Sequence, residues 1–447
     1  MKKRILCFLL MLFLCFIASS LAVAATTQSE LLSQIKSETA VLIDAETGQV
    51  LFAKDMHKKM YPASITKIMT ALLALENGNL QDKITMTEQA VFSIGRGTSH
   101  IALDVDEEIT LEQALYALAI ESANDAANGI AENIGGSLSV FTSLMNKRAL
   151  ELGALNTNFV NAHGLPDEQH YTTAYDMARI TMEAAKIPEF KKIFSTLDYE
   201  IPPTNKQTEV RYLHSTNAML RGEYRYDGIL AAKVGWTQIA QHTRITVAKR
   251  NNRTLIVVVM KTASKNDSCE DTIKLLDFGF NEFRSITFSQ ETVNKSNVVL
   301  SDETGIEYQT NFIASQPQNF LLHEQIKPSQ VKISYELPTK LALSGTTSGK
   351  ALLFLPTYLG EFMYTSIGAI TLQAKDEKGF ALGLINSKSG RTWQQKALAL
   401  ASGLFKTLLL LLVLGLGIRY YNVRKRKRRR KQRLARRELT SKKYESE

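Results

Sequence analysis

The chain has 447 residues and a formal net charge of +10, and the excess of basic residues lies at its two ends. Residues 419–447 hold 14 Lys and Arg against 3 Asp and Glu, whereas residues 25–418 hold 37 against 41, so the net charge says nothing about the partners of the main part. Two of the three cysteines, Cys7 and Cys15, precede residue 25, and the remaining Cys269 excludes a disulfide framework and a Cys/His metal cluster.

The first residues have the composition of a secretory signal peptide. They read "MKKRILCFLLMLFLCFIASSLAVAATTQ", with three cations, an apolar stretch and then small residues that end at Ala24. An alternative reading is a first transmembrane anchor. The small residues before Ala24 favour the signal peptide, so we expect residues 1–24 to be removed by cleavage after Ala24.

Residues 25–285 are predicted to form the main domain, with an α+β fold. The stretch "AVLIDAETGQVLFAKD" predicts a β-hairpin, and "YPASITKIMTALLALENG" predicts a helix that ends at "NG". Helical patterns continue to about residue 200 and are followed by the strand-like "AAKVGWT", "HTRITVAKR" and "RTLIVVVMKT" and an amphipathic helix, "CEDTIKLLDFGFNEF". This order predicts an antiparallel sheet flanked by helices, in which the first hairpin joins the last strands and a helical lobe is inserted between them.

Residues 286–380 change to short β segments separated by Ser, Thr, Gly and Pro, and they include "NVVLS", "VKISYEL", "ALLFLP" and "AITLQA". This pattern predicts a small all-β domain. The length of residues 25–418 is consistent with one large domain and one smaller domain.

The segment 397–418, "ALALASGLFKTLLLLLVLGLGI", is apolar except for Lys406 and is long enough for one transmembrane helix. The basic segment that follows, 419–447, predicts that the tail is cytoplasmic and that everything before the span lies outside the membrane. Nucleic-acid binding is the alternative for such a basic run. Its position beside an apolar span favours a role in topology and contact with anionic lipids, and we expect no nucleic-acid partner.

Ser64 and Lys67 are the first pair that could carry chemistry. They are three residues apart in "SITK", so on a helix they share one face, with Ser64 near the positive helix start. A serine needs a base to become a nucleophile, and a lysine can be that base when burial or another cation lowers its pKa. Taken alone, the pair favours a capped helix that carries a surface lysine, because S-x-x-K occurs often by chance.

Two further motifs follow. Ser122 and Asn124 lie in "SAN", where a hydroxyl and an amide could pass a proton and hold a carbonyl, although either could instead cap the next helix. Lys233 and Gly235 lie in the strand-like "KVGWT", where the glycine would let a ligand lie against the backbone.

The three motifs S-x-x-K, S-x-N and K-x-G occur in the order typical of the penicillin-recognising serine acyl-transferases. More closely, the chain resembles the low-molecular-mass D-alanyl-D-alanine carboxypeptidases, which are penicillin-binding proteins. The resemblance also rests on "YPASITKIMTAL", "SANDAAN", "NAHGLPDEQHYTTAYDMARI" and "IKLLDFGF", and it covers about residues 30–285. It implies the fold of the penicillin-recognising transpeptidases and β-lactamases, and the β-rich region fits the small membrane-proximal domain of this family.

The resemblance implies a reaction and catalytic residues. Ser64 would attack the carbonyl between the two terminal D-alanines of a peptidoglycan stem peptide, Lys67 would take its proton, and Ser122 would pass a proton to the departing D-alanine. The expected partners are therefore stem peptides and β-lactam antibiotics. Water would release the shortened peptide, so we expect no cofactor and no metal. The sequence does not predict an oligomeric state.

The resemblance also implies substrate-binding residues. Asn124 would hold the substrate amide and Lys67, and Lys233 would hold Ser122 and attract the substrate carboxylate. Gly235 would let the substrate approach, and the backbone N–H groups of Ser64 and Trp236 would form the oxyanion hole. His163, in "HGLPD", is interpreted as a residue that holds the helical lobe together.

Val234 departs from the family pattern, which has Thr or Ser at this position. Loss of a hydrogen bond to a carboxylate costs about 1.5–3 kcal/mol, which weakens activity without abolishing it. Thr237 could supply a substitute hydroxyl, and Gln241 or Arg244 could reshape the carboxylate site. We therefore expect an active serine-type D-Ala-D-Ala carboxypeptidase. The alternatives are a weakly active or inactive homologue that binds penicillin or the cell wall, and a β-lactamase-like hydrolase.

Overall fold

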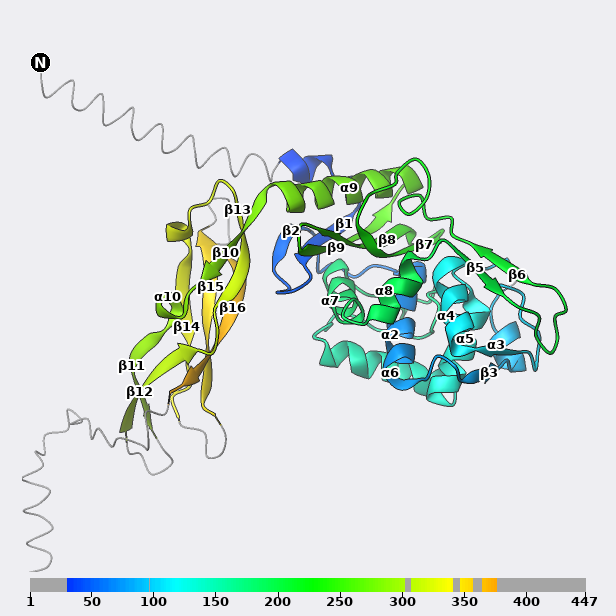
Figure 1. The fold of residues 1–447 in the computed structure, drawn as a ribbon, viewed down its shortest axis with the longest axis horizontal. Coiled ribbons are helices and arrows are strands. Elements are labelled where there is room, and N and C mark those ends of the chain that lie inside the picture. Colours follow the sequence, from blue (N-terminus) through cyan, green and yellow to red (C-terminus); the bar gives the residue numbers. More distant parts are fainter. Residues whose placement is uncertain (1–29, 96, 302–306, 341–345, 357–363, 376–447) are drawn as a thin grey trace, which may run out of the picture. The chain divides into compact units, whose positions relative to one another are not determined.

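A computed structural model describes residues 30–95, 97–301, 307–340, 346–356 and 364–375 (Figure 1). The predicted signal peptide, transmembrane helix and basic tail lie outside these residues. Within the described ranges, every helix is too short or too polar to cross a membrane.

The chain divides into two compact units. Among the described residues, the first holds 30–95, 97–296, 311–338, 346–356 and 364–375, and the second holds 297–301, 307–310 and 339–340. The predicted boundary between residues 285 and 286 falls inside a strand, β10 (Phe283–Phe288), and stays a prediction.

The centre of the first unit is an antiparallel sheet with the order β2-β1-β9-β8-β7. Its strands are β1 (Thr39–Asp44), β2 (Val50–Lys54), β7 (Ile229–Thr237), β8 (Gln241–Arg250) and β9 (Arg253–Thr262). The N-terminal hairpin β1–β2 joins the last strand, β9, so this part of the predicted topology is confirmed. In this order β7 is an edge strand.

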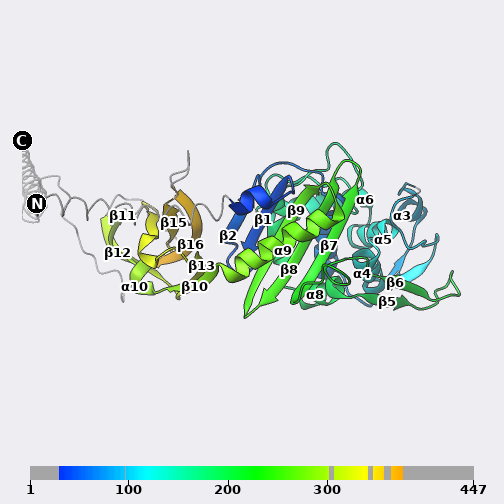
Figure 2. The same cartoon turned by 90° about the horizontal axis from the view of Figure 1, so that it is seen from above.

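The two faces of the sheet pack against different partners. Side chains alternate along β9: Ile256 and Val258 join the core shared with the helical lobe, whereas Val257 and Val259 join a second core on the opposite face. The helix α9 (Lys265–Asn281) contributes to this second core, and Figure 2 shows it lying across the sheet. These two faces explain why β1 and the middle of β9 are almost continuously apolar.

The inserted lobe is mainly helical. Its helices are η1 (Ala63–Thr66), α2 (Lys67–Asn77), α3 (Glu88–Phe92), α4 (Leu111–Ile120), α5 (Asn124–Gly135), α6 (Leu138–Glu151), α7 (Ala174–Ala184) and α8 (Pro188–Ser195). Two short hairpins accompany them, made by β3 (Lys83–Thr85) with β4 (Glu108–Thr110) and by β5 (Asp198–Ile201) with β6 (Arg211–His214). The predicted stop at "NG" is confirmed, because α2 ends at Asn77.

Local sequence explains where α4 begins and where α5 ends. Thr110 and Gln113 form a capping box, in which the Thr110 hydroxyl accepts from the backbone N–H of Gln113 and the Gln113 side chain accepts from that of Thr110. The helix α5 stops at Gly136, whose φ of +74° suits a residue without a side chain. The short break between these helices holds Ser122.

The C-terminal described region is rich in β structure, as predicted. Its elements are β10, α10 (Gln290–Val293), β11 (Lys295–Ser301), β12 (Glu307–Ala314), β13 (Gln318–His323), η2 (Pro328–Gln330), β14 (Lys332–Glu336), β15 (Ser348–Pro356) and β16 (Tyr364–Ala374). The strands β12, β16, β15 and β14 follow one another in an antiparallel sheet, and β10 pairs with β13.

Candidate active site

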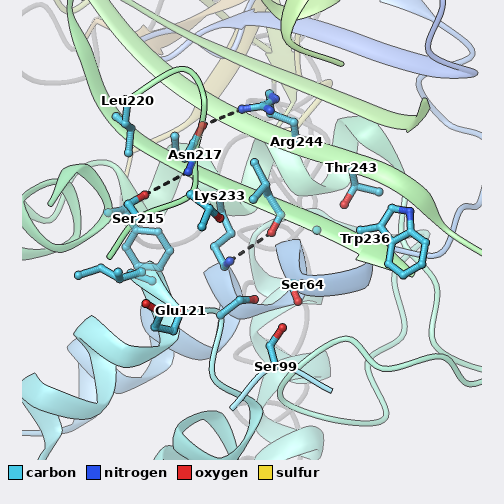
Figure 3. Close-up of a pocket in the computed structure, with 18 of the residues that line it drawn as sticks. Ser64, Ser99, Glu121, Ser215, Asn217, Leu220, Lys233, Trp236, Thr243 and Arg244 are labelled. Atoms are coloured by element: carbon cyan, nitrogen blue, oxygen red, sulfur yellow. Dashed lines mark hydrogen bonds between the residues drawn. The ribbon is translucent and has the colours of Figure 1, made fainter. Parts of the chain in front are cut away.

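A cavity of about 310 Å³ opens beside the edge strand β7. Its wall combines residues of η1, of the α4–α5 break, of β7 and β8, and of the segment that follows β6. Figure 3 shows Ser64, Ser99 and Lys233 pointing toward the same space, with Trp236 at one side. The predicted residues Ser64, Ser122, Lys233, Gly235 and Trp236 all line this cavity.

Ser64 lies in the 3₁₀ turn η1, and Lys67 is the first residue of α2. Lys67 is fully buried, and its Nζ lies 3.1 Å from Ser64 Oγ, 2.7 Å from Asn124 Oδ1 and 2.7 Å from the carbonyl oxygen of His163. The structure therefore brings together Ser64, Lys67 and Asn124 from two of the three sequence motifs. It places Lys67 beneath the cavity wall and not on the surface.

The surroundings of Lys67 suit a base. Burial holds the pKa of its ammonium well below the usual range, and the positive charge of Lys233 lowers it further. The oxygens of Asn124 and His163 can only accept hydrogen bonds. They therefore take the two N–H groups of a neutral Lys67 amine, and its lone pair is left for the Ser64 hydroxyl.

Ser122 lies in the sharp break between α4 and α5, with a φ of +58° that is uncommon for a residue with a side chain. Its Oγ is buried and has no hydrogen-bond partner among the residues that the structure describes. The resemblance implies a hydrogen bond between Ser122 and Lys233. Within the described residues this hydrogen bond is absent. Lys233 Nζ instead donates to the carbonyl oxygen of its own neighbour, Val234, at 3.1 Å.

Lys233 is a buried cation on β7, with 2% of its surface exposed. Burial lowers the pKa of its ammonium to about 7, and the nearby carboxylate of Glu121 opposes this shift. Glu121 also lines the cavity, and its carboxylate accepts from the backbone N–H of His214 at 2.8 Å. Lys233 therefore changes its charge close to neutral pH.

Gly235 allows a close approach between β7 and the nucleophile. A Cβ atom at this position would lie 2.7 Å from the backbone nitrogen of Ser64 and 2.6 Å from Thr243 Oγ1, too close for any side chain. Trp236 follows on the strand and is 61% exposed. Thr237 lies at the end of β7, where its Oγ1 accepts from the backbone N–H of Ala240, and it is not one of the described residues that line the cavity.

Arg244 is the charged residue whose environment the sequence did not predict. It lies opposite Val234 in the β7–β8 register, lines the cavity and is only 1% exposed. Its guanidinium donates to Asn217 Oδ1 at 2.9 Å, to Cys269 Sγ at 3.0 Å and to Ser268 Oγ at 3.4 Å. No carboxylate of the described residues pairs with it, and burial lowers its pKa. The sequence named Arg244 as a residue that could reshape the carboxylate site, but nothing in the strand-like "HTRITV" predicted that it is buried.

His163 and His170 hold a loop against the helical lobe. The His163 carbonyl accepts from Lys67, and the ring of His170 shares a hydrogen bond with Thr66 at 2.9 Å. Burial lowers the pKa of His163 to about 3 and that of His170 to about 4, so both rings are neutral at physiological pH. No group of three or more His, Cys, Asp or Glu side chains within the described ranges is arranged to hold a metal ion.

The comparison with protein families identifies the class of this chain. Residues 23–264 match the model of the peptidase S11 family, D-alanyl-D-alanine carboxypeptidase. The chain belongs to this family, and the predicted resemblance is confirmed.

Individual relatives agree with this assignment. The chain is 37% identical over 291 residues to D-alanyl-D-alanine carboxypeptidase DacF of Bacillus subtilis, covering 63% of this chain and 72% of that protein. It is 27% identical over 385 residues to D-alanyl-D-alanine carboxypeptidase DacA of Haemophilus influenzae, covering 83% and 91%.

Solved structures extend the likeness to the fold. Penicillin binding protein 5 from Haemophilus influenzae is similar with a TM-score of 0.59 and 28% identity over 76% of this chain and 96% of that chain. A mutant of Streptomyces K15 DD-transpeptidase is similar with a TM-score of 0.52 and 27% identity over 55% and 98%. The chain thus has the α+β fold of penicillin-binding proteins and is a serine peptidase by family.

Proposed function

We propose that this protein is a serine-type D-Ala-D-Ala carboxypeptidase that removes the terminal D-alanine from peptidoglycan stem peptides. The observation that carries the proposal is the buried Lys67 amine, which lies 3.1 Å from Ser64 Oγ at the wall of an open cavity. This is the geometry of a nucleophile with its base. Family membership supplies the substrate class.

The acylation step follows from this geometry. Ser64 Oγ attacks the carbonyl carbon between the two D-alanines, and its proton passes to the neutral amine of Lys67. The backbone N–H groups of Ser64 and Trp236 stabilise the negative oxygen that forms. The C–N bond then breaks, Ser122 passes a proton to the departing amine, and free D-alanine leaves an ester on Ser64. Attack of water on this ester releases the shortened peptide and restores the serine.

Recognition of the substrate carboxylate rests on two buried cations. Val234 has no hydroxyl to donate, but Lys233 and Arg244 both line the cavity and neither forms a hydrogen bond to a carboxylate of the described residues. Glu121 lies near Lys233 without a hydrogen bond to it, and Arg244 has no carboxylate partner among the described residues. A buried charge that is not paired in this way favours an anionic ligand. We assign to Arg244 the part of the carboxylate contact that Val234 cannot make.

Penicillins are proposed as ligands of the same cavity. A β-lactam presents a strained amide to Ser64 and a carboxylate to the two cations, so it can form the same ester. Cleavage of the lactam bond leaves no separate amine to depart.

The proposed location is the cell membrane, with the catalytic domain outside and the basic tail in the cytoplasm. The support is the apolar segment 397–418 followed by cations in 419–447, together with the signal-like residues 1–24. Protease added to intact cells is expected to remove the catalytic domain and leave an epitope at the C-terminus intact. Loss of that epitope from intact cells contradicts the proposed orientation.

The test of function uses the full-length protein in detergent with a synthetic peptide that ends in D-Ala-D-Ala. We expect free D-alanine from the wild type and a loss of at least about 10³-fold for Ser64→Ala, because the nucleophile is missing. Ser99→Ala is the matched control, since Ser99 also lines the cavity but is assigned no role in the reaction. Labelling of Ser64 by penicillin without D-alanine release points to the alternative, a binding homologue. D-alanine release that survives Ser64→Ala contradicts the mechanism.

A further inference from the structure

The residue before the nucleophile has an unfavourable backbone conformation. Ala63 has a φ of +52°, in the left-handed region that residues with a side chain rarely adopt. Such a conformation persists only where the surrounding structure holds it in place, and it is found most often at functional sites. Contacts with neighbouring residues must therefore hold the turn before Ser64 in this conformation.

Contacts from two sides hold this turn. On the lobe side, Gly164 lies so close to Ala63 that a Cβ atom at position 164 would come within 1.8 Å of the Ala63 carbonyl oxygen. On the sheet side, the hydroxyl of Thr243 donates to the carbonyl oxygen of Pro62 at 2.8 Å. Thr243 is 1% exposed, so this hydrogen bond is shielded from water.

Thr243 is also tied to the second donor of the oxyanion hole. It lies opposite Gly235 in the β7–β8 register, and the next pair is Trp236 with His242. The two proposed donors, the N–H groups of Ser64 and Trp236, belong to segments far apart in the sequence. The Thr243 hydroxyl donates to the turn that precedes Ser64, and Thr243 itself lies on β8, which pairs with the strand β7 that carries Trp236. Figure 3 shows Thr243 beside Trp236.

We propose that Thr243 is a positioning residue for acyl transfer, which acts by holding the Pro62 carbonyl and thereby the N–H of Ser64 at a fixed distance from that of Trp236. This inference rests on the proposed function. Thr243 lines the cavity, but its hydroxyl donates to the Pro62 carbonyl, so we assign its effect to the step in which negative charge develops. Gly235 gains a second reason to lack a side chain, because a Cβ atom there would meet Thr243 Oγ1 at 2.6 Å.

The decisive variant is Thr243→Val, which keeps the shape of the side chain and removes the donor. We expect the rate of acylation by a fluorescent penicillin and the kcat for D-alanine release to fall by about tenfold, the effect of losing one buried hydrogen bond. We expect KM to change by less than about twofold, because the hydroxyl faces Pro62 and not the substrate. Thr243→Ser restores both rates.

Thr246→Val is the matched control. Thr246 lies on the same strand, is equally buried, and its hydroxyl has no hydrogen-bond partner among the described residues. Deleting this hydroxyl is expected to leave the acylation rate unchanged. Thr243→Cys, which substitutes a weaker donor, is a second test that does not depend on the folding of Thr243→Val. Its acylation rate is expected to lie between those of Thr243→Ser and Thr243→Val.

Two results overturn the proposal. One is a Thr243→Val protein that melts at a lower temperature but is acylated at the wild-type rate. The other is a Thr243→Cys protein that is acylated as fast as Thr243→Ser. Failure of the proposed function gives a different pattern, because acylation by penicillin then still reports on Thr243 while the wild type releases no D-alanine.

Discussion

The cavity has one wall from the helical lobe and one from the sheet, and the two walls differ in how their charged groups are partnered. On the lobe side, Lys67 is surrounded by acceptors that it can satisfy within the protein. On the sheet side, the hydrogen bond that Lys233 makes within the described residues goes to a backbone carbonyl, and Arg244 donates to an amide, a hydroxyl and a thiol. The lobe wall is therefore prepared for the chemistry before a substrate arrives, whereas the sheet wall keeps its charge available for the substrate.

The strongest test of this difference is Arg244→Gln. We expect KM for a peptide ending in D-Ala-D-Ala to rise by about 10- to 100-fold, because a hydrogen bond between charged groups contributes about 1.5–3 kcal/mol. The same peptide with a C-terminal amide in place of the carboxylate is expected to be bound equally weakly by wild type and variant. Steady-state kinetics with both peptides provides the measurement.

Arg253→Gln is the control for Arg244→Gln. Arg253 is a partly buried arginine of the same sheet, and its guanidinium donates to the carbonyl oxygen of Gly279, away from the cavity. Its replacement is expected to leave KM unchanged. A KM for Arg244→Gln that is also unchanged removes Arg244 from the carboxylate site.

The second test uses pH and addresses Lys233. Its pKa is lowered to about 7 by burial, so the ammonium loses its charge as the pH rises through this value. We expect KM for the carboxylate-ended peptide to rise above neutral pH, by at most about tenfold per pH unit. Lys233→Arg keeps the charge and is expected to show a flat KM over the same range. A flat profile for the wild type contradicts this role of Lys233.

The smallest expected effect concerns Val234→Thr. The new hydroxyl is placed opposite Arg244 in the strand register and could donate to the same carboxylate, so kcat/KM is expected to rise by up to about tenfold. Val234→Ala serves as the control for a change of shape without a donor. If kcat/KM falls for Val234→Thr, then valine belongs to a reshaped carboxylate site, and the missing hydroxyl is not a loss for activity.

Much of the architecture could be predicted because it follows from local patterns. Short β-rich runs predicted the strands, Gly78 marked the end of α2, and the chain order of strands and helices led to the inserted lobe. The three motifs contain Ser64, Ser122, Lys233 and Gly235 of the cavity wall, together with the buried Lys67 and Asn124 next to Ser64. These features depend on residues that are close together in the sequence.

The rest depends on contacts between distant segments. Ser64 lies in a 3₁₀ turn, and Ala63 before it has a left-handed conformation. Two contacts hold this turn: Gly164 packs against the Ala63 carbonyl, and Thr243 donates a hydrogen bond to the Pro62 carbonyl. The acceptor for Lys67 at His163 is a backbone carbonyl, which no side-chain pattern reveals. The burial of Arg244 depends on partners in α9 and in the segment after β6.

The predicted contact between Lys233 and Ser122 shows that a residue role implied by family resemblance need not appear in the free site. Both residues line the cavity, but Lys233 donates to Val234 and the Ser122 hydroxyl is left without a partner among the described residues. A buried hydroxyl without a partner carries an energetic cost unless a ligand satisfies it. The free site therefore leaves Ser122 available for the leaving amine.

The central claim is that Ser64, activated by Lys67, forms an ester with the substrate. The most direct measurement is mass spectrometry of the full-length protein after brief incubation with a penicillin, followed by digestion and sequencing of the modified peptide. We expect one penicilloyl group, located on Ser64, and no such group on the Lys67→Ala protein over the same time. A label on another residue, or unchanged labelling without the lysine, contradicts the central claim.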